Sequence, residues 1–143
     1  MAVVHRAAFA PFGAEQMYAL VNDVEAYPDF LPWCVAAVVL TAQDELMQAR
    51  LTVKKGLLDY AFTTANRLTP GRAISLKLID GPFKKFNGAW RFEPVEGGCL
   101  IKFDVEFEFA SRLLGAALSA AFKPLADSLV DAFKTRAHAV YEC

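Results

Sequence analysis

Residues 101–109 alternate without exception between apolar and charged side chains. The apolar positions are Ile101, Phe103, Val105, Phe107 and Phe109, and the charged ones are Lys102, Asp104, Glu106 and Glu108. Successive side chains of a β-strand point to opposite faces of the sheet, so the segment predicts a strand with one apolar and one charged face. Such a strand is typical of an antiparallel sheet that packs one face on a core and exposes the other to water.

Six further segments carry strand signals, which brings the predicted sheet to seven strands. They span residues 3–10, 35–41, 47–54, 58–64, 74–79 and 86–92. The gaps at 69–71 and 96–98 contain glycine or proline and are the size of hairpin turns. A helix is expected to open at Gly13, because Met17, Leu20, Val21 and Val24 follow helical spacing. The stretch 27–34, interrupted by prolines, predicts a short apolar helix or turn.

Residues 80–92 form the most distinctive segment of the sheet. Gly81 and Pro82 predict a tight turn, because proline has no N–H to donate and glycine tolerates unusual dihedral angles. After the turn, large aromatic rings and one glycine share a single face: Phe86, Gly88, Trp90 and Phe92. Two interpretations stay open at this point: a curved core strand, or the wall of an apolar ligand cavity. Lys84 and Lys85 belong either to a solvated turn or to a contact with a lipid headgroup, a quinone oxygen or a phosphate.

The remaining segment, 111–141, predicts one long helix with Ser111 as a plausible cap. Its apolar stripe consists of Leu114, Leu118, Phe122, Leu125, Leu129, Phe133 and Val140. At 1.5 Å per residue the helix would be roughly 45 Å long, longer than the roughly 29 Å width of seven strands. It must therefore cross diagonally, overhang or bend, and Pro124 offers a bend. Residues 113–122 carry no charge, which indicates deep packing, a mobile lid over a cavity, or a surface for a membrane or partner.

Composition limits the classes of function. A chain of 143 residues fits one domain spanning 1–143, and a 55% hydrophobic content needs a thick core, a cavity lining or an exposed patch. A net charge of −1 gives no broad attraction for nucleic acid, so no DNA partner is expected. No apolar run approaches the roughly 20 residues that span a bilayer, and no signal peptide is recognisable, so we expect a cytoplasmic protein.

The sequence offers no set of residues for catalysis or metal binding. Cys34, Cys99 and Cys143 are scattered, and His5 and His138 lie near opposite ends of the chain. Neither a disulfide framework nor a metal site is therefore expected. Three carboxylates, Asp23, Glu25 and Asp29, fall near a turn, where solvated acidic groups are common. We interpret Cys34 as a small buried hydrophobe, and we predict a protein that is not an enzyme.

With these elements in view, the chain resembles the START-like family of coenzyme-Q-binding proteins and their bacterial RatA relatives, which are sometimes grouped under polyketide cyclase/dehydrase. The resemblance covers essentially the whole chain. Its most specific parts are residues 20–34, 80–86 and 90–92, followed by 107–109, 111–114 and 130–133. The resemblance implies an α+β helix-grip fold, a curved seven-stranded antiparallel sheet around a long C-terminal helix in the order β-α-α-β-β-β-β-β-β-α. Because the chain begins at its first strand, we expect the bacterial type.

The resemblance also implies a function. It suggests binding of ubiquinone or a similar isoprenoid lipid between sheet and helix, in support of respiratory electron transfer, with contact at the inner-membrane surface. Bacterial members are also described as ribosome-association toxins that bind the large subunit, and this alternative stays open. A polyketide cyclase or aromatase is supported by fold analogy alone. The expected cavity wall comprises Trp33, Tyr60, Phe62, Leu78, Trp90, Phe103, Val105, Leu118, Phe122 and Leu125.

Overall fold

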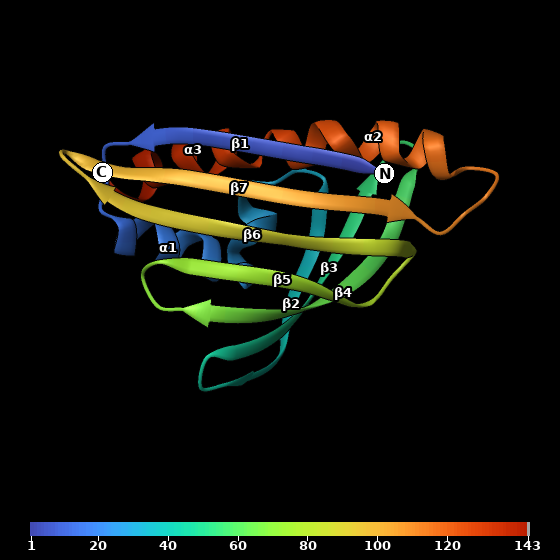
Figure 1. Ribbon diagram of the computed structural model, residues 1–143, viewed down its shortest axis with the longest axis horizontal. Coiled ribbons are helices and arrows are strands. Elements are labelled where there is room, and N and C mark those ends of the chain that lie inside the picture. Colours follow the sequence, from blue (N-terminus) through green and yellow to red (C-terminus); the bar gives the residue numbers. More distant parts are fainter. Residues whose placement is uncertain (143) are drawn as a thin grey trace.

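A computed structural model describes residues 1–142 of the chain (Figure 1). Its elements are, in chain order, β1 (Ala2–Ala10), α1 (Ala14–Asn22), the 3-10 helix η1 (Val24–Asp29), β2 (Cys34–Gln43), β3 (Leu46–Lys55), β4 (Leu58–Thr69), β5 (Ala73–Asp80), β6 (Phe83–Val95), β7 (Gly98–Phe109), α2 (Gly115–Asp127) and α3 (Leu129–Tyr141). The predicted order of strands and helices is confirmed, except that the last helix is divided in two.

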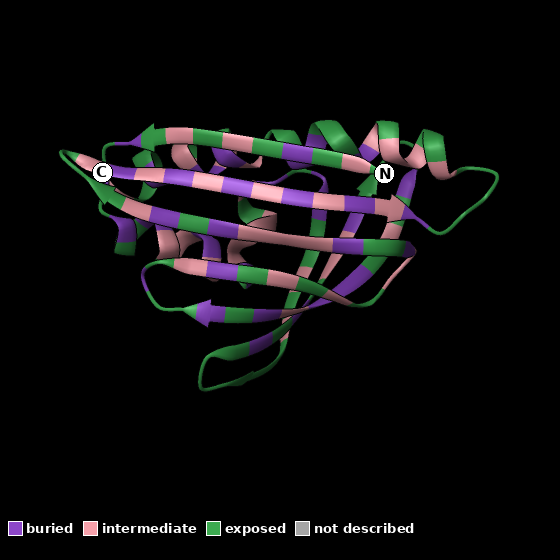
Figure 2. Cartoon of the chain, in the orientation of Figure 1, coloured by how far each residue is buried: buried purple, intermediate pink, exposed green. Residues whose placement is uncertain are grey.

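The strands form one antiparallel sheet in the order β1-β7-β6-β5-β4-β3-β2. Strands β2 to β7 follow one another as hairpins, and β1 pairs with β7 along its whole length. The alternation predicted for β7 is confirmed: every second residue from Ile101 to Phe109 is buried, which Figure 2 shows as regular banding. The sheet therefore has one apolar inner face and one polar outer face.

Local irregularities bend this sheet. The pairing register shifts at two places in β2, once between Thr63 and Thr64 of β4, and once between Phe83 and Lys85 of β6. A bulge adds twist and bends its strand. The shift in β6 turns both Phe83 and Phe86 to the inner face, although they are three residues apart. Figure 1 shows β2 and β3 running steeply across the direction of β1, β6 and β7, so the sheet curls around its inner face.

The C-terminal helices cross the inner face, but not as one rod. Helix α2 starts at Gly115 rather than at Ser111. The Ser111 hydroxyl instead accepts a hydrogen bond from the N–H of Leu114, in the turn that precedes α2. The interruption lies at Ser128, one turn after Pro124, while Pro124 itself sits inside α2. Arg6 of β1 reaches this junction.

Arg6 attaches strand β1 to both helices at their junction. Its guanidinium donates to the carbonyl of Asp127 at 3.0 Å, and lies 3.3 Å from the carboxylates of Asp127 and Asp131. The carbonyl belongs to the last turn of α2, where backbone acceptors lack helical partners and favour a nearby cation. This contact holds the end of α2 and the start of α3 against the edge of the sheet.

Deep packing of residues 113–122, one of the three interpretations, is wrong for the start of the segment. Leu113 is 96% exposed and Leu114 50% exposed. Ala116, Ala117 and Ala120 are exposed as well, and burial begins only at Phe122. The apolar start of the segment therefore lies outside the core, which leaves the lid and the contact surface as interpretations.

The core is centred on Phe133 of α3. Its ring makes edge-to-face contacts with Tyr27 of η1 at 5.4 Å, with Phe30 at 5.3 Å and with Trp90 of β6 at 5.3 Å. These rings join α3 to the sheet and to the segment formed by η1 and Phe30. Aromatic contacts of this kind add stability beyond the burial of their area.

Replacing Phe133 with alanine should lower the free energy of unfolding by about 3–5 kcal/mol, because it removes a fully buried ring and its contacts. Urea denaturation measures the change. Leu113→Ala is the control, since a residue 96% exposed should change stability by less than about 0.5 kcal/mol. Equal losses in the two variants would show that Phe133 is not a centre of the core.

Candidate functional site

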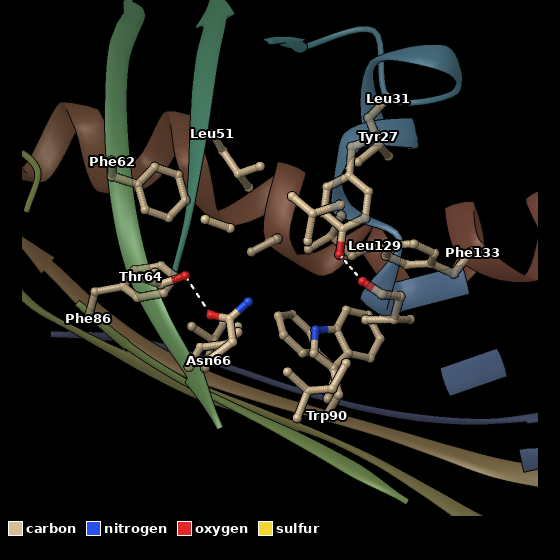
Figure 3. Close-up of a pocket in the computed structure, with 18 of the residues that line it drawn as sticks. Tyr27, Leu31, Leu51, Phe62, Thr64, Asn66, Phe86, Trp90, Leu129 and Phe133 are labelled. Atoms are coloured by element: carbon tan, nitrogen blue, oxygen red, sulfur yellow. Dashed lines mark hydrogen bonds between the residues drawn. The ribbon is translucent and has the colours of Figure 1, made fainter. Parts of the chain in front are cut away.

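An apolar cavity of about 80 Å³ lies between the inner face of the sheet and the C-terminal helices (Figure 3). Strands β3 to β7 form its floor. Val21, Tyr27 and Leu31, from α1, η1 and the loop that follows, close one side. The helices contribute a stripe at helical spacing: Phe122, Ala126, Leu129 and Phe133. The cavity is thus built where the curved sheet separates from the helices that cover it.

Six of the ten side chains predicted for the cavity wall line it: Trp33, Phe62, Trp90, Phe103, Val105 and Phe122. The other four lie elsewhere: Tyr60, Leu78, Leu118 and Leu125. All four are buried or half-buried in the core. These four side chains point toward the inner side of the sheet, as predicted. They lie further along their strand or helix than the cavity, or beside it.

Tyr60 belongs to an aromatic cluster at the start of β4. Its ring lies 5.7 Å from Phe83, 5.7 Å from Phe109 and 6.1 Å from Phe62. Its buried hydroxyl has no hydrogen-bond partner among residues 1–142. Burial raises the pKa of Tyr60 above its ordinary value, so the hydroxyl stays protonated.

Leu78, Leu118 and Leu125 are displaced for geometric reasons. On β5 the cavity is lined by Ile74 and Leu76, and Leu78 lies one step further along the same face. Leu118 is one turn before Phe122, and the sequence neighbour Ala126 takes the lining position next to Leu125. A helix turns about 100° per residue, so Leu125 and Ala126 are both buried but point in different directions, and only Ala126 lines the cavity.

Aromatic packing holds the floor of the cavity in place. Trp90 stacks on Phe103 with ring centroids 4.2 Å apart. Phe133 contacts the same indole edge-to-face. Large rings that contact one another leave few alternative rotamers, so the floor around Trp90 has a defined shape.

Two polar side chains, Thr64 and Asn66, interrupt the apolar wall, and the inward position of Asn66 was not predicted from the sequence. Thr64 and Asn66 of β4 are both buried, and the Thr64 hydroxyl donates to Oδ1 of Asn66 at 2.7 Å. The predicted strand ended at Thr64. Extending its alternation by one step would have placed Asn66 on the inner face with Phe62 and Thr64.

The remaining polar groups near the cavity are neutral. The hydroxyl of Tyr27 donates to the carbonyl of Val21, and burial raises its pKa. Cys34 is buried, as predicted, and burial raises the pKa of its thiol to about 11. Such a thiol is almost entirely protonated at neutral pH and is a poor nucleophile.

The charged residues considered as catalytic candidates lie outside the cavity. Glu25 accepts the backbone N–H of Val39 at 3.1 Å, and Asp29 lies 3.9 Å from Arg136. His5 pairs with Asp104 on the outer face of the sheet. Within residues 1–142 no three His, Cys, Asp or Glu side chains come together as metal ligands do. No acid–base pair therefore faces the cavity in the described part of the chain.

Lys84 and Lys85 also lie outside the cavity. Lys84 lies 3.5 Å from Glu108, and Lys85 3.2 Å from Glu106. They lie in strand β6 rather than in a turn, and their side chains are solvated, as one of the two interpretations expected, while they form cross-strand ion pairs with β7. No helix within residues 1–142 is long and apolar enough to cross a membrane.

Comparison with known proteins agrees with this fold and cavity. The model of the family described as polyketide cyclase/dehydrase and lipid transport matches residues 11–134. The chain belongs to this family. It is 44% identical over 142 residues to the ribosome association toxin RatA of Escherichia coli K12, covering 99% of this chain and 90% of that protein. The resemblance to the START-like coenzyme-Q-binding and RatA proteins is confirmed.

Three other proteins resemble this chain in sequence or in fold. The chain is 31% identical over 135 residues to the mitochondrial coenzyme Q-binding protein COQ10 homolog B of Xenopus laevis, covering 91% of this chain and 55% of that protein. A START superfamily protein from Mycobacterium smegmatis has a TM-score of 0.82 at 22% identity, over 96% and 98% of the two chains. The Zhui aromatase/cyclase of Streptomyces has a TM-score of 0.78 at 17% identity, over 95% and 93%. These two structures support the fold alone, and the α+β helix-grip prediction is confirmed.

Proposed function

We propose that the protein binds ubiquinone or a similar isoprenoid lipid in the cavity and carries it without chemical change, in support of respiratory electron transfer. The observation that carries this proposal is the cavity itself: aromatic and aliphatic walls, two polar side chains on one strand, and no carboxylate, histidine, lysine or arginine among its lining residues. Small-molecule sites are built in this way, with few polar groups that fix orientation. The coenzyme Q-binding relative adds support.

The energetics favour a ligand with an apolar tail. Burying one isoprene unit of five carbons contributes about 4 kcal/mol at roughly 0.8 kcal/mol per carbon. Association costs on the order of 4–15 kcal/mol, so a ring alone binds weakly and several tail units supply the affinity. The cavity of about 80 Å³ is smaller than the roughly 300–1,000 Å³ of ordinary ligand sites. Loading therefore requires the helices to move away from the sheet.

The exposed start of the C-terminal helical segment favours loading at a membrane surface. Leu113 and Leu114 project from the loop before α2, next to the exposed Arg112, and Lys123 is exposed on α2 itself. Apolar side chains flanked by cations suit the interface of an anionic bilayer, where the former enter the acyl region and the latter meet the headgroups. Contact there would draw the start of α2 away from the sheet, and α2 carries the lining residues Phe122 and Ala126.

Ribosome association is a second candidate function, and the outer face of the sheet favours it. Arg50, Arg67 and Lys77 lie on adjacent strands, are exposed, and make no ion pair within residues 1–142. By contrast, three outward cations of β6 and β7 are paired with carboxylates: Lys84, Lys85 and Lys102. Arg91 of β6 is exposed and makes no ion pair within residues 1–142. Exposed cations without carboxylate partners suit contact with phosphates of RNA. The identity of 44% to RatA proteins supports this candidate.

Cavity filling tests the carrier function. Ala126→Leu adds three carbon atoms to a lining position, so the purified protein should lose most of the lipid that wild type retains and should not take up added ubiquinone. Organic extraction followed by mass spectrometry measures both. Ala120→Leu, on the exposed side of the same helix, is the control and should behave as wild type. Repeated absence of lipid from wild type, with no uptake on addition, would contradict the proposal.

Removing the exposed leucines tests the loading route. Leu113→Ser combined with Leu114→Ser should slow ubiquinone uptake from anionic vesicles by about tenfold, since two leucine side chains no longer enter the bilayer. Uptake from detergent micelles should stay unchanged. Val38→Ser with Leu40→Ser removes two exposed apolar side chains from β2 and is the control. If the control variant slowed uptake to the same extent, Leu113 and Leu114 would have no specific role in loading.

Charge removal tests the ribosome function. The triple variant Arg50→Gln, Arg67→Gln, Lys77→Gln should reduce co-sedimentation with large ribosomal subunits on the order of tenfold at about 0.1 M salt, because phosphate contacts dominate such binding. The control triple variant Lys84→Gln, Lys85→Gln, Lys102→Gln changes the net charge equally but removes paired cations. Failure of wild type to co-migrate with large subunits, or equal loss in both variants, would argue against this candidate.

A further inference from the structure

The polar groups on the cavity floor provide hydrogen-bond donors without acceptors. Asn66 is only 5% exposed, and its amide nitrogen has no hydrogen-bond partner among residues 1–142. The nitrogen is not one of the fully enclosed polar atoms without a partner within residues 1–142, which are Asn22 Oδ1 and the Tyr60 hydroxyl, so its free N–H groups open onto the cavity that Asn66 lines. An amide in this position is therefore explained best by a partner that comes from outside the chain.

Thr64 determines which end of the Asn66 amide faces the cavity. Its hydroxyl donates to Oδ1 of Asn66 at 2.7 Å, so the oxygen is occupied and the nitrogen is turned the other way. Figure 3 shows the amide nitrogen directed away from Thr64, into the space between Leu51, Leu129 and Trp90. Thr64 is thus a positioning residue, and Asn66 presents N–H groups rather than a carbonyl.

Trp90 supplies a second donor on the same floor. Its indole lines the cavity, and its nitrogen is not one of the enclosed polar atoms without a partner within residues 1–142, so the N–H is open to a ligand in the cavity. Stacking on Phe103 at 4.2 Å and the edge contact with Phe133 fix the ring plane. One strand separates the two donors: on β5, Leu76 lies opposite Asn66 and Ile74 opposite Trp90. Both donors therefore reach the cavity from the same face of the sheet, at cross-strand positions two residues apart on β5.

We propose that the Asn66 amide and the Trp90 indole form a carbonyl-binding site, and that the cavity selects apolar ligands whose ring carries acceptor oxygens, of the quinone type, in their oxidised form. The inference rests on the proposed carrier function and adds to it the chemistry of the head group. A quinone carbonyl accepts from N–H groups and offers no competing donor. The corresponding hydroquinone brings O–H donors to a surface that is already rich in donors, and a hydrocarbon leaves both N–H groups unpaired.

Three probes with one tail separate these cases: decyl-benzoquinone, its hydroquinone kept under anaerobic conditions, and decylbenzene. Isothermal titration of the full, delipidated chain measures each affinity. Wild type should bind the quinone about tenfold more tightly than decylbenzene, because each neutral hydrogen bond contributes roughly two- to tenfold. It should also prefer the quinone to the hydroquinone.

Three variants test the residues. Asn66→Leu should weaken quinone binding by about three- to tenfold and leave decylbenzene binding unchanged or tighter. Its thermal stability should stay close to that of wild type, because the added apolar burial offsets the loss of the acceptor for the Thr64 hydroxyl. Trp90→Phe should weaken the binding of both the quinone and decylbenzene, because the ring is smaller. The loss should be greater for the quinone, because it alone accepts from the indole N–H. Thr64→Val keeps the shape and releases the amide, so quinone selectivity should fall while decylbenzene affinity stays the same.

The outcomes separate this inference from the carrier function. If wild type binds none of the three probes, the carrier function fails. If it binds all three equally, or if Asn66→Leu and Trp90→Phe keep the quinone selectivity of wild type, the carrier function stands and the carbonyl site is wrong. Tighter binding of the hydroquinone than the quinone would also overturn the inference, because Asn66 would then present its oxygen. Thr64→Val keeps the test valid if Asn66→Leu does not fold.

Discussion

The structure depends on the packing of helices against the apolar face of the sheet, which they cover only in part. The inner face of seven strands must be shielded from water, and the available cover is α1, η1 and the interrupted pair α2–α3. Phe133 supplies the central contact, because it joins Trp90 of the sheet to Tyr27 and Phe30 of the cover. On one side of that contact the layers pack tightly. On the other side the sheet curves away, and the space between them becomes the cavity.

Small and polar side chains keep this space from being filled by the protein itself. Ala49 and Ala126 stand at lining positions where larger apolar residues would pack. Thr64 and Asn66 occupy inner positions of β4 that would otherwise take aliphatic groups. A core optimised for stability would not leave such gaps or an unpaired amide, since both cost free energy. Departures of this kind are expected at functional sites, where binding is favoured over tight packing.

The sequence was sufficient to predict the seven strands, because a period of two in β7 and its neighbours has no helical counterpart. The position of a side chain along its strand, relative to the cavity, was not predictable in the same way. Tyr60 and Leu78 share the inner face with lining residues, yet they lie beyond the cavity, since periodicity specifies a face and not a position along it. The interruption at Ser128 rather than Pro124 depends on how Arg6 and the sheet edge hold the helix junction. Tertiary contacts of this kind leave no local signal.

The two proposed functions use opposite faces of the same strands. Asn66 faces the cavity while its neighbour Arg67 faces outward, and the same holds for Leu76 and Lys77 on β5. Because alternate side chains on a strand do not contact one another, a change on one face leaves the chemistry of the other intact. A ligand in the cavity would therefore affect the outer cations only if it changed the spacing of β3, β4 and β5, which carry Arg50, Arg67 and Lys77. The curvature that creates the cavity is therefore also the feature that sets the geometry of the outer cationic surface.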